Sequence, residues 1–159
     1  MGETQLKPGD KAPRFILPDK DGNKVELGQF AGQWVVLYFY PKDNTPGCTK
    51  EACGFSERLK EFEQLDAVVL GVSRDSETSH RSFAEKYDLG FPLLSDPDHR
   101  VMEMYGAWQP KRLMGRELLG PVRMTFLIDP EGKVAHVWPR VQVWGHVAEV
   151  RKKLTEFRG

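Results

Sequence analysis

Residues 39–53 read FYPKDNTPGCTKEAC, and both cysteines of the 159-residue chain, Cys48 and Cys53, lie in this stretch. It begins at the end of the apolar run 34–40, which is rich in β-branched and aromatic residues and favours a central strand buried on both faces. It continues into apolar positions spaced by three and four, the pattern of an amphipathic helix: Ala52, Phe55, Leu59, Phe62 and Leu65. The stretch therefore predicts a strand, a turn and a helix that starts at Cys48.

A thiol at the start of a helix lies in a favourable electrostatic position for ionisation. The first N–H groups of a helix have no intrahelical partner, and the helix dipole favours negative charge there. A thiol at that place ionises more readily, and the thiolate is the nucleophile. Cys48 is thus a candidate nucleophile. The alternative is an inert, buried cysteine, because free cysteines are among the most buried residues.

Strands and helices alternate on both sides of this stretch. The apolar pieces 15–17 and 25–27 flank turn residues and predict a small β-hairpin. Further strands are expected at 67–72, 91–94, 124–128 and 134–138, and further helices after Ser76, after Pro97 and from Gly145 to Phe157. This order, ββαβαβα followed by a hairpin and a helix, predicts an α/β protein with a sheet flanked by helices.

Two parts of the chain lack such a pattern. Residues 106–121 contain several glycines and prolines, and we expect them to form a long loop. Residues 1–7 are polar, and we expect them to be frayed. The whole chain, 1–159, has the length of a single domain.

The composition excludes several classes of function. Lys plus Arg and Asp plus Glu each number 23, so no basic excess points to nucleic acid or to an anionic membrane. No apolar run reaches the roughly 20 residues that span a bilayer, and the first residues lack the apolar core of a signal peptide. We therefore expect a cytoplasmic protein. Two cysteines in a reducing compartment favour catalysis or redox sensing over a disulfide framework.

The motif Pro41-x₃-Thr45-x₂-Cys48 resembles the active-site motif of the peroxiredoxins. The extension TPGCTKEAC at 45–53 is similar to the Q-type subgroup, also called bacterioferritin comigratory proteins. The similarity runs from PGDKAP at 8–13 to RMTFLID at 123–129, which is nearly the whole chain. It implies a thioredoxin-like fold, in which helices flank a central mixed sheet and a β-hairpin precedes it.

The resemblance also implies a function and a set of site residues. Cys48 would be the peroxidatic cysteine, whose thiolate attacks the O–O bond of a peroxide and becomes a sulfenic acid. Cys53 would be the resolving cysteine, Thr45 would hydrogen-bond the peroxide, and Pro41 would shield the thiolate. Arg123 would stabilise the thiolate and the departing oxygen. Without the resemblance, Thr45 would be a turn residue and Arg123 a solvated residue at a strand start.

The partners follow from the same resemblance. The substrates would be hydrogen peroxide and organic hydroperoxides, and a thioredoxin-like or glutaredoxin-like reductant would recycle the disulfide. No cofactor is implied, and the four histidines show no spacing typical of a metal site. We expect a monomer, with a weak dimer as the alternative.

The spacing of the two cysteines places a condition on this cycle. In an intact helix, five residues advance about 7.5 Å and turn about 140°, whereas a disulfide needs Cα atoms within roughly 7 Å. Cys53 can therefore react with Cys48 only if the first helical turns unwind. In the sequence pattern only Cys48 and Ala52 of these turns face inward, so we expect this end of the helix to be weakly anchored.

Two other classes of protein are compatible with the predicted fold. Dithiol electron carriers and disulfide isomerases usually carry Cys-x₂-Cys at the helix start, whereas the spacing here is Cys-x₄-Cys. A metal-binding or copper-delivery domain would need closely spaced cysteines and a positioned histidine. A peroxide-consumption assay, an insulin-reduction assay and metal analysis separate the three.

Overall fold

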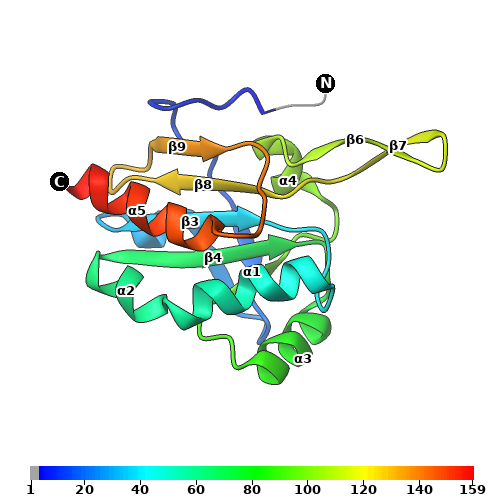
Figure 1. Ribbon diagram of the computed structural model, residues 1–159, viewed down its shortest axis with the longest axis horizontal. Helices are drawn as coiled ribbons and strands as arrows, with labels where there is room; N and C mark the ends of the chain where they lie inside the picture. Colours follow the sequence, from blue (N-terminus) through cyan, green and yellow to red (C-terminus); the bar gives the residue numbers. More distant parts are fainter. Residues whose placement is uncertain (1–3) are drawn as a thin grey trace.

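The computed structural model describes residues 4–159, apart from the side chain of Leu113. Its centre is a five-stranded sheet in the order β5-β4-β3-β8-β9 (Figure 1). Strands β5, β4 and β3 are parallel, β8 is antiparallel to β3, and β9 is antiparallel to β8. The bounds are β3 (Trp34–Phe39), β4 (Ala67–Ser73), β5 (Leu93–Ser95), β8 (Met124–Ile128) and β9 (Val134–Trp138). This confirms the predicted α/β class and its mixed sheet.

Strand β3 occupies the middle of the sheet, and its residues divide between two apolar cores. Val35, Leu37 and Phe39 point into one core, and Val36 and Tyr38 into the other. This alternation follows from the two-residue period of a strand. Because residues 35–39 are at most 2% exposed, the prediction of a strand buried on both faces is confirmed.

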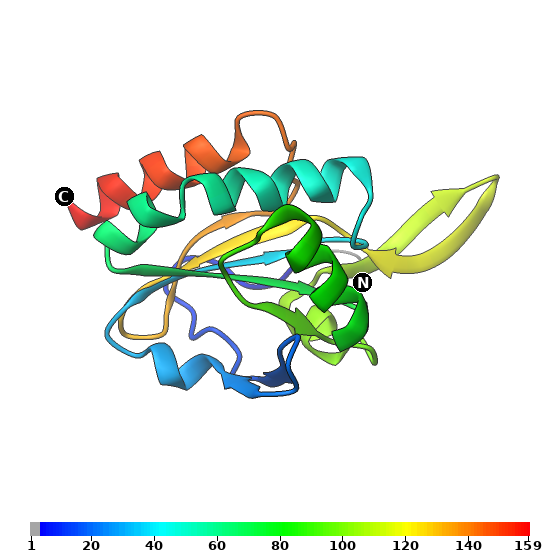
Figure 2. The same cartoon turned by 90° about the horizontal axis from the view of Figure 1, so that it is seen from below.

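Helices cover one face of the sheet and form what we call the helix-side core (Figure 2). They are α1 (Pro46–Glu57), α2 (Leu59–Gln64), α3 (Glu77–Tyr87) and α5 (His146–Arg158). The opposite face carries the predicted N-terminal hairpin, a 3₁₀ helix and one short helix: β1 (Ile16–Pro18), β2 (Lys24–Glu26), η1 (Leu27–Phe30) and α4 (Arg100–Tyr105). The result is the layered arrangement expected from the sequence.

The helix expected from Cys48 to Leu65 differs in two respects from the prediction. It begins at Pro46, which takes the first helical position, where its missing N–H leaves no bond unmade. It is interrupted at Arg58, where φ is −105° and ψ is 11°, so that α1 and α2 are separate helices. Phe55 and Phe62 lie on either side of the break, and both are fully buried with ring centroids 5.8 Å apart.

The predicted loop at 106–121 is wrong. It is a β-hairpin of β6 (Trp108–Leu113) and β7 (Arg116–Pro121) that projects from the body of the molecule (Figure 1). Met114 and Gly115, at the tip, have φ of 51° and 78°, as two-residue hairpin turns require. Pro110 is tolerated because this sheet has only two strands. The backbone nitrogen of Pro110, which has no hydrogen to donate, can point away from β7.

The expectation that residues 1–7 are frayed stays a prediction, although two residues of this segment contact the body of the molecule. Leu6 packs against the core on the hairpin side of the sheet, and Thr4 lies directly over Gly106. Residues 1–3 of the segment expected to be frayed lie outside the described residues. The helix expected after Ser76 is confirmed as α3, and the Ser76 hydroxyl caps it by accepting a hydrogen bond from the backbone N–H of Ser79.

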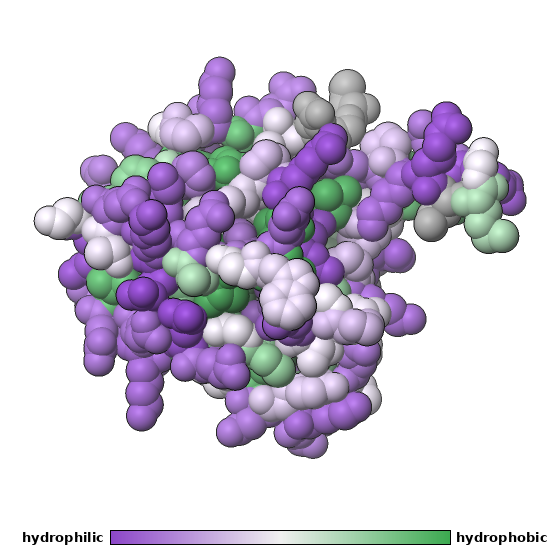
Figure 3. Space-filling model, viewed as in Figure 1, coloured by the Kyte–Doolittle hydropathy of each residue, from purple (hydrophilic) through white to green (hydrophobic). Residues whose placement is uncertain are grey.

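The surface seen in Figure 3 is largely hydrophilic, with scattered apolar side chains. None of the helices in residues 4–159 has the length and apolar character needed to cross a membrane. The large apolar side chains that are exposed come from several elements: Ile16, Met104, Met114, Leu118, Leu119, Trp144 and Phe157.

Gly71 leaves room for an aromatic group beneath α1. It pairs with Tyr38 across β4 and β3. A Cβ at position 71 would lie 2.9 Å from Cζ of Tyr38 and 3.0 Å from Cδ2 of Leu93. The Tyr38 ring in turn stacks on Phe55 of α1 at 4.8 Å. The absence of a side chain at position 71 therefore leaves room for the Tyr38 ring, whose stacking on Phe55 holds α1 against the sheet.

Gly71→Ala should accordingly destabilise the protein. Forcing one extra methyl group into a filled core typically costs about 1–3 kcal/mol. Gly28→Ala is a matched control, because a Cβ at Gly28 meets nothing within 4 Å. Urea denaturation of both variants gives the free energies of unfolding, and equal values for the two would contradict this account of Gly71.

Candidate active site

Cys48 lies in the first turn of α1 and is 1% exposed. Thr45 is the N-cap residue, and the first helical bond runs from the N–H of Thr49 to the carbonyl of Thr45. The N–H groups of Gly47 and Cys48 precede that bond, so the helix gives them no acceptor. The structure thus confirms the predicted position of Cys48 at a helix start, where N–H groups and the dipole favour an anion.

Arg123 comes from a distant part of the chain to meet this helix start. It immediately precedes β8, whose Met124 pairs with Phe39 at the end of β3. Its Nη2 donates to Sγ of Cys48 at 3.4 Å, and its Nη1 donates to Oε1 of Glu51 at 2.7 Å. A Cβ at position 47 would lie 3.1 Å from Nη2, so Gly47 gives the guanidinium room to approach.

Glu51 is the site residue that sequence reasoning missed. Its side chain is completely buried and accepts a hydrogen bond from Arg123, which is itself 17% exposed. Burial raises the pKa of Glu51 to about 7, against the opposing effect of the Arg123 charge. The available signal was its place three residues after Cys48, which puts both on one face of a helix. The first turns of α1 are therefore anchored more firmly than Cys48 and Ala52 alone would allow.

A single guanidinium thus serves two groups that can carry negative charge. Burial opposes the charge of Arg123, but the Glu51 carboxylate and the Cys48 sulfur raise its pKa above the ordinary value. Close beneath them lies Tyr38, whose pKa is raised by burial and then by the charges of Glu51 and Cys48. Neither the Tyr38 hydroxyl nor Oε2 of Glu51 has a hydrogen-bond partner within residues 4–159.

Thr45 and Pro41 lie in the turn that joins β3 to α1. The Thr45 hydroxyl donates to the carbonyl of Lys42 at 2.8 Å and makes no capping bond. Pro41 is half-buried and follows Tyr40, whose N–H completes the sheet by bonding the carbonyl of Val72. The structure brings Arg123 into direct contact with Cys48 and Glu51, and Thr45 and Pro41 lie in the turn that leads into this helix.

Cys53 lies farther along α1 and is half-buried. Burial, followed by the nearby Glu57 carboxylate, raises the pKa of its thiol. Cys53 is therefore held in the thiol form at neutral pH, which is unsuitable for a primary nucleophile. Both cysteines are free thiols in this structure.

The base of the projecting hairpin also borders the site. Burial and the Arg123 charge lower the pKa of Lys111, while Cys48 acts in the opposite direction. The relation of Lys111 to the site depends on the fold of β6 and β7, which the sequence pattern did not reveal.

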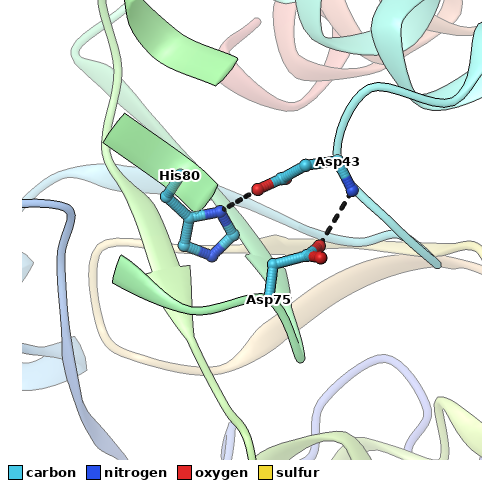
Figure 4. Close-up of side chains that lie close together, drawn as sticks. All are labelled: Asp43, Asp75 and His80. Atoms are coloured by element: carbon cyan, nitrogen blue, oxygen red, sulfur yellow. Dashed lines mark hydrogen bonds and ion pairs between the residues drawn. The ribbon is translucent and has the colours of Figure 1, made fainter. Parts of the chain in front are cut away.

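A second polar cluster lies on the other side of the turn (Figure 4). Asp43, Asp75 and His80 each offer one possible metal-ligand atom, and these atoms lie within 4.8 Å of one another. Protein hydrogen bonds already occupy them. Asp43 accepts from Tyr40, Ser79 and His80, and Asp75 accepts from Ser73 and from the backbone N–H of Asp43. The cluster is a closed hydrogen-bond network in this structure.

Comparison with known proteins identifies the family of this chain. Residues 8–137 match the model of the AhpC/TSA family. The chain belongs to that family. Peroxiredoxin Bcp of Bacillus subtilis is 46% identical over 149 residues, covering 94% of this chain and 95% of that protein. Peroxiredoxin Bcp of Escherichia coli K12 is 48% identical over 141 residues, covering 89% and 90%.

Solved structures agree with this assignment. Peroxiredoxin Q of Xanthomonas campestris has a TM-score of 0.88 and 40% identity, covering 96% of this chain and 97% of that one. A second structure, of the bacterioferritin comigratory protein of that organism, was studied for alkyl peroxide reduction. It has a TM-score of 0.90 and 39% identity, covering 99% of this chain and 100% of that one. The chain is therefore a thiol peroxidase of the Bcp, or Q-type, peroxiredoxins with a thioredoxin-like fold.

The raised pKa of Glu51 makes the stability of this peroxiredoxin depend on pH. Folding raises that pKa from 4.5 to about 7, so between these values the folded protein holds a proton that the unfolded chain has released. The stabilisation is complete below pH 4.5 and is lost as the pH rises through 7. At 1.36 kcal/mol per pKa unit, the change is about 3 kcal/mol.

Glu51→Gln should remove this pH dependence. Subtracting its free energy of unfolding from that of the wild type cancels the other titrating groups. We expect the wild type to lose about 3 kcal/mol relative to the variant across this pH window. Glu63→Gln, at an exposed position of α2, is the control and should show no such change. A pH-independent difference for Glu51→Gln would show that Glu51 does not titrate in this range.

Proposed function

We propose that this peroxiredoxin reduces hydrogen peroxide and organic hydroperoxides through Cys48, with Cys53 as the resolving cysteine. The observation that supports this most directly is the 3.4 Å contact between Nη2 of Arg123 and Sγ of Cys48 at the start of α1. A guanidinium beside the sulfur and the start of a helix both favour negative charge at this place, and the thiolate is the nucleophilic form of cysteine. The alkyl peroxide reduction studied in the Xanthomonas campestris relative supports organic hydroperoxides as substrates.

The first step is attack of the Cys48 thiolate on the distal oxygen of the peroxide. An S–O bond forms, the O–O bond breaks, and the remaining oxygen leaves as hydroxide or alkoxide, which takes up a proton. Cys48 becomes a sulfenic acid. Arg123 can stabilise the negative charge as it moves from sulfur to the leaving oxygen, since a guanidinium offers several donors in a fixed geometry. Thr45 would hydrogen-bond the peroxide by accepting a bond at its hydroxyl oxygen, since its hydrogen is donated to the Lys42 carbonyl. Pro41 would keep water from the thiolate.

The second step returns the enzyme to its starting state through Cys53. The sulfur of Cys53 attacks the sulfur of the Cys48 sulfenic acid, an S–S bond forms, and water leaves. A dithiol protein of the thioredoxin or glutaredoxin class would then reduce this disulfide by exchange. The raised pKa of Cys53 is consistent with this sequence of steps, because a thiol is a poorer nucleophile than a thiolate and Cys48 would react with peroxide first. A cytoplasmic location remains our prediction for this protein.

Substitution of the two cysteines tests the assignment of roles. Cys48→Ser should abolish peroxide reduction, because serine cannot form the sulfenic acid. Cys53→Ser should reduce one equivalent of peroxide and then stop as sulfenic acid, or as a mixed disulfide with added thiol. Peroxide loss and the protein mass are measured with candidate reductants supplied one at a time. Thioredoxin-linked peroxidase activity in Cys48→Ser would refute the proposal, and an insulin-reduction assay tests the dithiol-carrier alternative.

Arg123→Ala tests the electrostatic part of the mechanism. Removal of one donor aimed at developing charge typically slows a reaction by about 10²–10³-fold. Arg123→Lys should recover only part of the rate, because an ammonium group cannot bond Cys48 and Glu51 with a planar fork. Arg158→Ala, at the far end of α5, is the control. Single-turnover rates of Cys48 oxidation decide the matter, and an unchanged rate in Arg123→Ala would return this arginine to a structural role.

A further inference from the structure

Asp43 is a buried acid in the turn between β3 and α1, and the mechanism above does not use it. It is 5% exposed. Its Oδ1 accepts a hydrogen bond from the Tyr40 hydroxyl at 2.6 Å, and its Oδ2 accepts from the Ser79 hydroxyl at 2.8 Å. The same Oδ2 lies 2.8 Å from Nδ1 of His80 (Figure 4). Its backbone N–H donates to Asp75 at 2.8 Å.

These contacts join the turn to elements outside the active site. Asp75 follows β4, and both Ser79 and His80 belong to α3. The His80 ring is fully buried, and its Nε2 lies 3.0 Å from the carbonyl of Leu94 in β5. A carbonyl only accepts, so Nε2 carries a proton. Nδ1 faces an oxygen of Asp43, so each nitrogen of the buried ring has a protein partner.

The turn held by this network carries the groups that would contact the peroxide. Thr45 follows Asp43 by two residues, and its hydroxyl bonds the carbonyl of Lys42, which precedes Asp43. Asn44, between them, has a φ of 63°. Such a left-handed conformation persists where the surroundings fix it. The location of the Thr45 hydroxyl therefore depends on the location of Asp43.

We propose that His80, acting through Asp43, is a positioning residue for the peroxide: it fixes the 41–45 turn so that Thr45 and Pro41 meet the substrate. The inference rests on the proposed function, since it assumes that Cys48 attacks a peroxide held beside Thr45. The proposal concerns the position of the bound substrate. Stabilisation of the thiolate is the role of other groups. The contact between Cys48 and Arg123 is made by α1 and the start of β8 and does not pass through His80.

A matched pair of substitutions separates the two bonds of the His80 ring. The amide nitrogen of asparagine is as many bonds from Cβ as Nδ1 of histidine, so His80→Asn keeps a donor toward Asp43. The amide nitrogen of glutamine is as many bonds from Cβ as Nε2, so His80→Gln keeps the donor toward Leu94. Both variants replace the imidazole ring by an amide. They differ in whether the turn or β5 retains its partner.

Two rates are measured on each full-length variant: single-turnover oxidation of Cys48 by hydrogen peroxide, and alkylation of Cys48 by iodoacetamide in the Cys53→Ser background. Alkylation reports the reactivity of the thiolate and does not need Thr45. We expect His80→Gln to slow peroxide oxidation by about tenfold or more, since a 1 Å misplacement can cost 10²-fold. His80→Asn should be faster than His80→Gln. Alkylation should be unchanged in both.

Three outcomes would overturn the inference: equal peroxide rates in the two variants, the reverse order, or a parallel loss of peroxide and alkylation rates. Ser79→Ala provides a test with a milder variant, because it removes one bond to Asp43 from a half-buried position. Losing one such bond should slow peroxide oxidation by roughly 2- to 10-fold and leave alkylation unchanged. A wild-type peroxide rate in Ser79→Ala would contradict the role of Asp43.

Failure of the underlying function is distinguishable from failure of this inference. If Cys48 did not reduce peroxide, the wild type would show no oxidation of Cys48, or Cys48→Ser would remain active. If only the inference failed, the wild type would be oxidised normally at Cys48, and the His80 pair would show no difference between the two bonds of the ring.

Discussion

One guanidinium between two buried groups that can become anions is the interaction on which the site depends. Arg123 bonds Cys48 and Glu51 at once, and it is the nearest cation to both. Each group alone would be unfavourable as an anion in an apolar core, because burial of an unpaired charge is costly. The sheet makes the pairing possible by bringing the residue before β8 to the end of β3. Gly47 completes it by leaving space for the guanidinium.

The surroundings of this pairing are apolar and rigid. Cys48 belongs to the helix-side core, and Tyr38 below it stacks on Phe55 at 4.8 Å and on Tyr40 at 5.4 Å. In such a setting water screens charges weakly, so the Arg123 contacts are stronger than at a surface. The same setting raises the pKa of Glu51 to about 7. Activation of the sulfur and the pH sensitivity of the fold therefore have one physical cause.

The features that could be predicted from the sequence are those that depend on local patterns of residues. The alternation of strands and helices and the helix start at Cys48 follow from periodicity and turn residues, and the family resemblance pointed to Arg123. Glu51 was missed because a glutamate in a helix resembles a solvated residue until its partner, 72 positions away, is known. The network of Asp43 and His80 spans 37 positions and was hidden for the same reason. The β6–β7 hairpin was missed because its glycines and prolines suggested a loop.

The buried ion pair also bears on the proposed disulfide, which requires the first turns of α1 to unwind. The unwinding segment has firm limits: Asp43 is tied to α3 upstream, and Phe55 is stacked in the core downstream. Between them, the bond from Arg123 to Glu51 must break. Oxidation removes the thiolate from Arg123, which loosens one of its two contacts. Folding raises the pKa of Glu51 from 4.5 to about 7, and unwinding would expose this carboxyl to water and return its pKa toward 4.5. The protonated form of Glu51 therefore favours the wound helix, and unwinding, and with it the reaction with Cys53, should become easier as the pH rises from 4.5 to about 7.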